Sequence, residues 1–212
     1  QIAESVTQKL KAQARTHGLT LNTLVQLAWG ITLSRFTGGY DVIFGMTSAG
    51  RPQEVSDIEH MAGVFIASLP LRTRFNPAER LVDCARQLQL DASELRSIDY
   101  MPLAEIQSYV DLEPGELLFD TALVFQNYPF PKELREMTTP KFDLLDVSES
   151  SNFPMMLQVE PSHILNINCS FDTQKVSQEL ATSMLTMLDE ALTYLSEGVE
   201  TLTYQLIDSF TL

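Results

Sequence analysis

The chain has few cysteines and no long apolar run, and each shortage excludes a class of protein. Only two cysteines occur among 212 residues, Cys84 and Cys169, so neither a disulfide framework nor a cysteine metal site is indicated. We expect both to be buried thiols in a reducing compartment. No stretch approaches the roughly 20 consecutive apolar residues that cross a bilayer, and no basic segment followed by an apolar run opens the chain. The sequence therefore predicts a soluble, cytoplasmic protein without a membrane partner.

Positive charge is also scarce. The chain carries 14 basic and 28 acidic residues, a formal net charge of -14. Such a charge repels phosphate backbones and anionic lipid, so nucleic acid is not an expected partner. A hydrophobic fraction of 44% is ordinary for a globular protein with a sizeable core. No repeat, linker or low-complexity tract divides the chain, and we expect one α/β domain over residues 1–212.

Histidine is almost missing, which limits acid–base chemistry. A general base or a nucleophilic triad needs a histidine with an orienting partner, and the chain offers only His17, His60 and His163. His17 precedes a glycine helix stop and His163 adjoins a turn, so both are expected at the solvated surface. His60 can face a cleft, although a solvated role is favoured there too. The three lack the close spacing of zinc ligands, so neither a catalytic residue nor a metal site is predicted.

The glycine-containing segments do not form a phosphate loop. Neither Gly-x-x-x-x-Gly-Lys-Ser/Thr nor Gly-x-Gly-x-x-Gly occurs, and the segment 45–50 leads into Arg51-Pro52 rather than a helix. Met184, Met187 and Leu188 have helical spacing that fits a core position better than a partner groove. The carboxylates at 189–200 are interpreted as a solvated helix face.

Hydrophobic periodicity predicts the elements. Helical spacing indicates helices over 4–16, 20–36, 81–95 and 176–195, the second apolar nearly all round and so expected in the core, with Thr20 or Asn22 as its N-cap. Strands are predicted over 41–47, 64–75, 117–126, 155–159 and 165–171. Pro70 marks an edge or a bulge in the second strand. The last two strands alternate apolar and polar residues and are expected to form a hairpin at Pro161-Ser162, while 128–140 has a loop composition.

Four short segments follow one another in a specific order. They are Phe-Gly-Met-Thr-Ser-Ala-Gly-Arg-Pro (44–52), Gly-Val-Phe-Ile-Ala-Ser-Leu-Pro-Leu-Arg (63–72), Tyr-Met-Pro-Leu-Ala-Glu-Ile-Gln (100–107) and Leu-Phe-Asp-Thr-Ala-Leu-Val-Phe-Gln-Asn-Tyr (118–128). In order and spacing they resemble the later motifs of nonribosomal peptide synthetase condensation domains. The stretches 19–29 and 152–156 and the last long helix also resemble that family. The family's earlier motif, His-His-x-x-x-Asp-Gly, does not occur in this sequence.

The resemblance implies a fold and half of an enzyme. Condensation domains consist of two chloramphenicol-acetyltransferase-like lobes that meet along a cleft, and the first lobe supplies the histidine motif. This chain resembles the second lobe, with a mixed sheet packed with helices in a two-layer sandwich. The first residue is Gln1 rather than Met, which we interpret as a chain cut from something longer.

The complete enzyme implied by the resemblance joins two thioesters on phosphopantetheine arms in antibiotic or secondary-metabolite synthesis. The expected partners are a first condensation lobe, peptidyl carrier domains that present phosphopantetheine, and an adjacent adenylation domain. No covalently bound cofactor is expected. Since no base is present, we expect the chain to be inactive by itself and its unpaired lobe surface to favour self-association. The alternatives are a non-catalytic module for carrier docking or lobe association and, more remotely, a stand-alone coenzyme A acyltransferase.

The resemblance also assigns candidate site residues. Thr47, Arg51, Gln126 and Asn127 are candidates for the substrate tunnel or the lobe interface. Gln126 and Asn127 are amides at the end of an apolar strand, where an amide can orient an acyl carbonyl or an amine. The structural motif positions are Gly45, Gly50, Gly63, Phe65, Pro102, Phe119 and Asp120. Ala67-Ser68 replaces the family's usual Asn-Thr, so that asparagine's contacts do not transfer to this chain.

Overall fold

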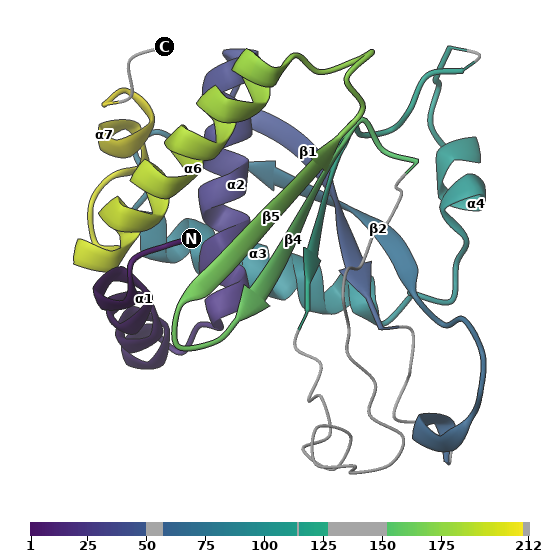
Figure 1. The fold of residues 1–212 in the computed structure, drawn as a ribbon, viewed down its shortest axis with the longest axis horizontal. Coiled ribbons are helices and arrows are strands. Elements are labelled where there is room, and N and C mark those ends of the chain that lie inside the picture. Colours follow the sequence, from purple (N-terminus) through teal and green to yellow (C-terminus); the bar gives the residue numbers. More distant parts are fainter. Residues whose placement is uncertain (50–56, 114, 127–151, 210–212) are drawn as a thin grey trace, which may run out of the picture.

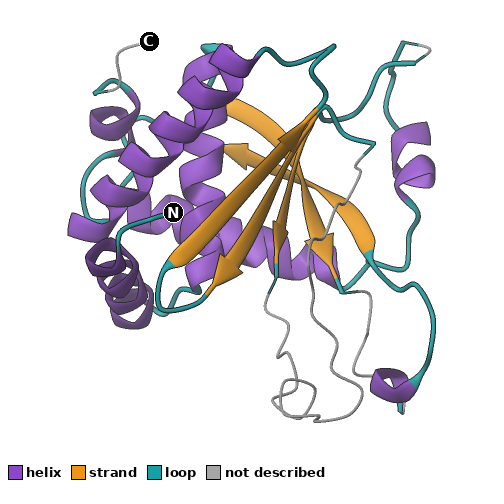
Figure 2. Cartoon of the chain, viewed as in Figure 1, coloured by secondary structure: helices purple, strands orange, loops and turns teal. Residues whose placement is uncertain are grey.

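The computed structural model describes residues 1–49, 57–113, 115–126 and 152–209. Its helices are α1 (Glu4–His17), α2 (Leu21–Thr37), α3 (Leu81–Arg96), α4 (Leu103–Ser108), α6 (Gln178–Glu197) and α7 (Thr203–Ile207), with a short 3-10 helix η1 (Ile58–His60). The strands are β1 (Asp41–Ser48), β2 (Ala67–Arg74), β3 (Thr121–Phe125), β4 (Met155–Pro161) and β5 (Leu165–Phe171). Figures 1 and 2 show the elements along the chain.

The strands form one mixed sheet in the order β2-β1-β3-β4-β5. β1, β3 and β4 are parallel, whereas β2 and β5 run antiparallel to β1 and β4 at the two edges. The parallel strands therefore end at the same border of the sheet, which is the lower border in Figure 1. The mixed α/β sheet predicted above is confirmed.

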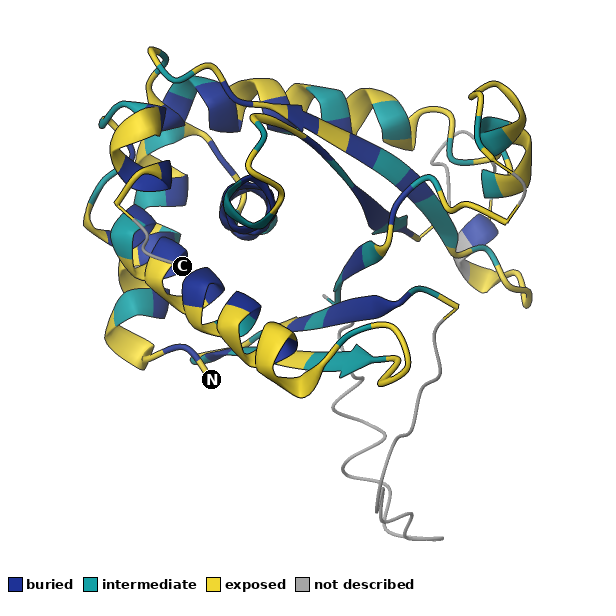
Figure 3. Ribbon diagram, turned by 90° about the horizontal axis from the view of Figure 1, so that it is seen from above, coloured by how far each residue is buried: buried dark blue, intermediate teal, exposed yellow. Residues whose placement is uncertain are grey.

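One face of the sheet carries the helical layer. Figure 3 shows α2 in the middle of the molecule, between α3 on one side and α6 on the other. All but five residues of α2 are buried, in agreement with its predicted core position, and Trp29 is fully buried. The Trp29 indole N–H donates to Thr121 Oγ1 over 3.2 Å, which ties the central helix to β3. Thr20 caps α2 by accepting a hydrogen bond from the Thr23 N–H. Of the two predicted N-cap residues, Thr20 and Asn22, the first is therefore confirmed.

Side-chain alternation assigns the two faces of the sheet. The residues that point toward the helices are Val42, Phe44, Met46, Leu69, Leu71, Leu123, Met155, Leu157 and Val159, all buried in the core. The opposite face, here called the open face, carries the intervening residues. Among the described helices only α4 flanks it, beside β2 (Figure 1). The molecule is thus the two-layer sandwich that the sequence predicted.

The predicted elements are all present, with shifted ends. β2 begins at Ala67 rather than Val64, and β3 begins at Thr121 rather than Leu117. Pro70 lies inside the edge strand β2, which is one of the two predicted alternatives, an edge or a bulge. The hairpin at Pro161-Ser162 is also confirmed. The sequence did not indicate η1, α4 or α7, which are too short for a periodic pattern, and the predicted loop 128–140 lies outside the described residues.

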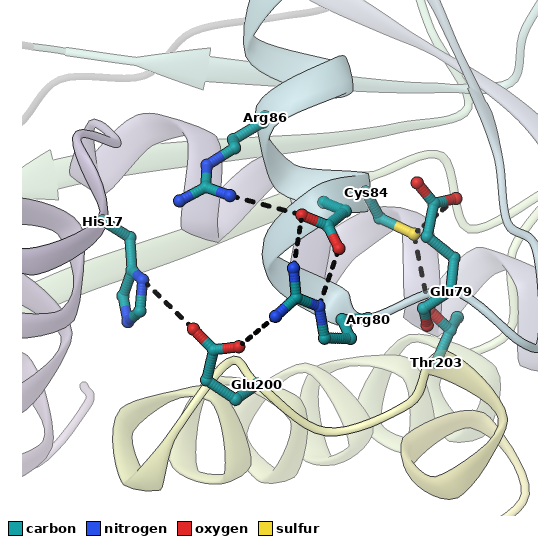
Figure 4. A network of polar contacts seen from close by, with 8 residues as sticks. His17, Glu79, Arg80, Cys84, Arg86, Glu200 and Thr203 are labelled. Carbon is teal, nitrogen blue, oxygen red and sulfur yellow. Dashed lines mark hydrogen bonds and ion pairs between the residues drawn. The ribbon is translucent and has the colours of Figure 1, made fainter.

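A polar network connects three parts of the helical layer, as Figure 4 shows. The Arg80 guanidinium, at the start of α3, donates to Asp83 at 2.8 Å and to Glu200, beyond α6, at 3.0 Å. Glu200 also lies 3.5 Å from His17 Nδ1 at the end of α1. Backbone bonds from Leu81 to Thr201 O and from Thr203 to Glu79 O reinforce this junction. Within the described residues, no helix is long and apolar enough to span a membrane.

Candidate functional site

The open face is polar where the parallel strands end. Thr47 lies on this face of β1 and is partly buried, next to Ser68 of β2. Val124 pairs with Gln158, and Gln158 pairs with Asn168, which continues the row across β3, β4 and β5. Two hydroxyls and two amides therefore lie in one band across the sheet.

Gln126 follows β3 at the same border. Its backbone N–H donates to Val159 O over 2.8 Å, which extends the β3–β4 ladder by one residue. The backbone at Gln126 is therefore fixed, and its side chain is partly buried. Alternation from Ala122 and Val124 assigns that side chain to the open face, the same face that carries Thr47. The structure thus brings two of the four predicted tunnel candidates to one border of one face, while Arg51 and Asn127 lie outside the described residues.

The aromatic residue of the fourth motif packs on the glycine of the first. A Cβ at Gly45 would lie 2.4 Å from Phe119 Cε2, so only glycine leaves room for that ring. The Phe119 ring is almost fully buried and its centroid lies 5.0 Å from that of Phe153. Asp120 is exposed, and its backbone C=O accepts from the Met155 N–H. These contacts agree with a packing role for Gly45 and Phe119.

The other motif positions also have local contacts. A Cβ at Gly63 would lie 3.0 Å from Phe65 Cε2, so the Phe65 ring lies close over the backbone of Gly63. Pro102 is the N-cap of α4, and its C=O accepts from the N–H groups of Glu105 and Ile106. Gly50 lies outside the described residues. Since Pro102 belongs to α4 beside β2, it is separated along the sheet from Gln126.

No histidine joins the polar band among the described residues. His60 is exposed at the end of η1, and His163 is exposed in the β4–β5 turn. His17 is more enclosed than the sequence suggested, with a side chain 15% exposed beside Glu200. No cluster of three or more potential metal ligands occurs in the described parts of the chain. The band can donate and accept hydrogen bonds, but it contains no group that exchanges protons near neutral pH.

The cysteines are free thiols with little tendency to ionise. Cys84 is buried between Glu79 and Thr203, and its pKa is raised, first by burial and further by the Glu79 carboxylate. Cys169 points toward the helices from β5, and burial raises its pKa to about 11. Cys169 is half-buried rather than fully buried as predicted. Neither thiol has the lowered pKa of a reactive cysteine.

Sequence reasoning missed some polar residues near this border. Gln158 and Asn168 complete the polar band, but only the strand order places Gln158 beside β3 and Asn168 beside Gln158. The alternation of apolar and polar residues in β4 and β5 indicated that Gln158 and Asn168 lie on a solvated face. This was the one sequence signal that could have identified them. Ser48, next to Thr47, is buried and its Oγ donates to Asp99 Oδ2 over 2.6 Å. No local pattern links these two residues, which are 51 positions apart.

Comparison with known proteins places this geometry in a known context. The family described as Condensation domain matches residues 1–209. A linear gramicidin synthase of Brevibacillus parabrevis is 35% identical over 191 residues, which are 90% of this chain and 4% of that protein. Bacitracin synthase 3 of Bacillus licheniformis is 32% identical over 187 residues, 86% of this chain and 3% of that protein. The chain thus spans only a small fraction of the curated relatives it matches.

Solved structures show the same fold. A four-domain nonribosomal peptide synthetase bound to AMP and glycine superposes with a TM-score of 0.83 at 14% identity, over 96% of this chain and 17% of that one. The first condensation domain of the calcium-dependent antibiotic synthetase, in complex with a substrate analogue, gives a TM-score of 0.76 at 14% identity. That match covers 96% of this chain and 44% of that chain.

Proposed function

The chain belongs to the condensation-domain family, and from that membership we propose that residues 1–212 form a single domain, the second lobe of a peptide-bond-forming condensation domain. The observation that carries the proposal is the coverage: nearly all of this fold corresponds to 44% of a solved condensation-domain chain. The sequence has the four later motifs and lacks His-His-x-x-x-Asp-Gly. The second lobe of a condensation domain is expected to contain the four later motifs and to lack the histidine motif that supplies the base.

The reaction of the complete domain joins two carrier-bound substrates. The amine of an acceptor aminoacyl thioester attacks the carbonyl carbon of a donor acyl thioester, so a C–N bond forms and a C–S bond breaks. A base on the first lobe accepts the amine proton, and the leaving thiolate finally takes up a proton. Each thioester is presented on the phosphopantetheine arm of a carrier domain. We expect this lobe to be inactive by itself because its sequence lacks the His-His-x-x-x-Asp-Gly motif that supplies the base.

The open face of the sheet forms this lobe's wall of the substrate tunnel. Thr47 and Gln126 lie on it at one border, and their side chains offer both donors and acceptors. The Gln126 amide orients a substrate carbonyl or amine, since its backbone is fixed by the bond to Val159. Asn127, which directly follows Gln126 in the sequence, and Arg51 are proposed as further tunnel or lobe-interface residues from their motif positions alone, since both lie outside the described residues. Arg51 helps to hold the two lobes together by charge-assisted hydrogen bonds.

The first lobe docks on an apolar segment at the same border. β2 begins at Ala67, which pairs with Ser48 at the end of β1, so residues 61–66 approach this border of the sheet. The side chains of Met61, Val64 and Ile66 are 44%, 94% and 57% exposed. Exposed apolar side chains concentrated in one short segment are typical of an interaction surface.

Lobe complementation tests the proposed function. The chain is mixed with a first lobe that carries His-His-x-x-x-Asp-Gly, and two carriers loaded with aminoacyl thioesters are added. We expect dipeptidyl carrier, detected by intact-protein mass spectrometry, only when both lobes are present. Carrier binding without turnover in the mixture would instead support the non-catalytic docking module. Turnover by this chain without the first lobe would contradict the assignment.

Three variants test the parts of the proposal, and two of them have matched controls. Gln126→Ala is expected to lower turnover by about tenfold to a hundredfold in the complemented enzyme, as for the loss of an orienting hydrogen bond, while Lys175→Ala, at the far end of the strands, leaves it unchanged.

Val64→Asp is expected to weaken lobe association, whereas Leu90→Asp on α3, where Leu90 is also well exposed, is its matched control. Arg51→Ala tests the lobe contact in the same binding assay. Equal association of the Val64 and Leu90 variants would remove the docking surface.

A further inference from the structure

The edge strand β2 presents backbone groups that the sheet does not use. Phe75, directly after β2, donates its N–H to Tyr40 O on the β1 side. Because backbone groups alternate in direction along a strand, Thr73 and Leu71 also bond toward β1. The N–H and C=O groups of Arg72 and Arg74 therefore point away from the sheet, and no described strand pairs with them. The backbone nitrogen of Pro70 also points away from the sheet, so the missing N–H removes no hydrogen bond to β1.

A groove runs beside this edge. It has a volume of about 770 Å³ and lies between β2 and the C-terminal half of α3, which passes behind the sheet in Figure 1. Leu71, Leu95 and Ile98 supply its apolar part. A strand edge with a helix beside it and a groove between them is the arrangement in which an extended peptide adds to a sheet.

The charges beside the groove differ on its two sides. Arg72 and Arg74 point to the open face. Asp41 lies on the same face and pairs with Arg72 at 2.6 Å, so these three side chains together carry one net positive charge. On the helix side, Asp91 and Glu94 line the groove. A strand added to β2 directs alternate side chains to these two sides. The open-face side favours acidic side chains, and the α3 side favours apolar ones and disfavours acidic ones.

We propose that the free edge of β2 and the groove beside α3 bind an extended peptide segment of a partner protein, in which acidic and apolar residues alternate. The segment adds as a further strand and bonds to the backbone of Arg72 and Arg74. Its acidic side chains lie beside the two arginines, and its apolar side chains contact Leu95 and Ile98. Pairing is confined to the C-terminal half of β2 because Pro70 offers no donor. This site lies outside the polar band and does not depend on the lobe assignment.

A proline substitution tests the backbone contribution. The probe is a capped peptide of alternating valine and glutamate with eight residues, the length of β2, and its binding to the full chain is measured by calorimetry. Arg72→Pro removes the outward N–H, and Arg72→Ala is the matched control that removes the same side chain and keeps that donor. We expect Arg72→Pro to bind about tenfold more weakly than Arg72→Ala, the factor for one lost hydrogen bond. Equal affinities would overturn the proposal.

Modified peptides give an independent measurement on the unaltered chain. Methylation of the peptide's backbone nitrogens removes its donors, and we expect it to abolish binding, while replacement of glutamate by lysine weakens binding by about tenfold or more. Equal affinity of the methylated and unmodified peptides overturns the proposal even if Arg72→Pro destabilises the fold. Light scattering gives a third test. If the chain forms a dimer that Arg72→Pro abolishes and Arg72→Ala preserves, this edge binds a second copy of the chain, and the proposal of a partner peptide is overturned.

Discussion

At the scale of single residues, the fold depends on close contacts that no larger side chain permits. Gly45 lies in β1 and Phe119 precedes β3, in a different motif, yet the Phe119 ring occupies the space that a Cβ at Gly45 would take. The same ring contacts Phe153, just before β4. The close approach of the Phe119 ring therefore gives a packing reason for glycine at position 45.

Gly45→Ala is expected to destabilise the chain by about 1–3 kcal/mol, because the added methyl must displace a buried ring or the backbone. Gly39→Ala is the control, since a Cβ there meets its nearest atom at an ordinary 3.9 Å. Urea unfolding measures both. If Gly45→Ala and Gly39→Ala unfold at the same urea concentration, the contact with Phe119 has no energetic weight.

The raised pKa of Cys169 predicts how the stability of the fold changes at alkaline pH. Burial raises the pKa of Cys169 to about 11 from an ordinary 9.0, so the unfolded chain loses this proton at lower pH than the folded one. The resulting stabilisation is complete below pH 9 and is lost as pH rises toward 11. Cys169→Ala should therefore show a smaller loss of unfolding free energy over this interval than the unaltered chain. Parallel pH profiles for the two proteins would contradict the burial of this thiol.

At the scale of elements, a specific polar bond helps to hold the central helix to the sheet inside a largely apolar contact. The chain has a single tryptophan, and its fully buried indole donates to Thr121 at the start of β3. Burial alone does not fix the rotation of a helix that is apolar nearly all round. The bond to Thr121 selects one orientation of α2 against the sheet.

Thr121→Val keeps the side-chain shape and removes the acceptor, which leaves a buried indole N–H without its partner. We expect a loss of about 1–3 kcal/mol. Thr193→Val on α6, at an exposed position, is the control and should change stability by less than about 0.5 kcal/mol. Trp29 fluorescence during urea unfolding measures both effects. A Thr121 variant as stable as the Thr193 variant would show that the bond contributes nothing.

At the scale of the whole molecule, the chain is closed by contacts between segments far apart in sequence. Arg80 connects the start of α3 to the segment after α6 through Glu200, and backbone bonds from Leu81, Val82 and Thr203 follow the same path. The arginine is half exposed, so the ion pairs are screened by salt. Their role is to keep the C-terminal segment against α3 rather than to supply much of the total stability.

Arg80→Gln is expected to speed amide hydrogen exchange at Leu81, Val82 and Thr203 at low salt and to have a smaller effect at high salt. Arg86→Gln is the matched control because Arg86 bonds to Asp83 of the same helix. Exchange is followed residue by residue by NMR. Equal exchange rates in the two variants, or an effect independent of salt, would contradict the proposed role of Arg80.

The sequence could predict the elements because their signals are local. The all-round apolar pattern of residues 20–36 placed α2 in the core, and the alternation of 165–171 gave β5 two unlike faces. Short elements such as α4 were missed because six residues carry too little periodicity. The site was predicted in part: Thr47 and Gln126 came from motifs, whereas Gln158 and Asn168 came only from the strand order.

The sequence by itself determined the long helices, the strands apart from their exact ends, and the family resemblance, since each depends on residues close together along the chain. Only the tertiary structure decided that β1 and β3 are parallel neighbours, that Phe119 covers Gly45, and that the outward groups of Arg72 and Arg74 face a groove along α3. The physical reason is that pairing and packing join residues tens of positions apart. Local propensity and periodicity do not specify which strand lies next to which.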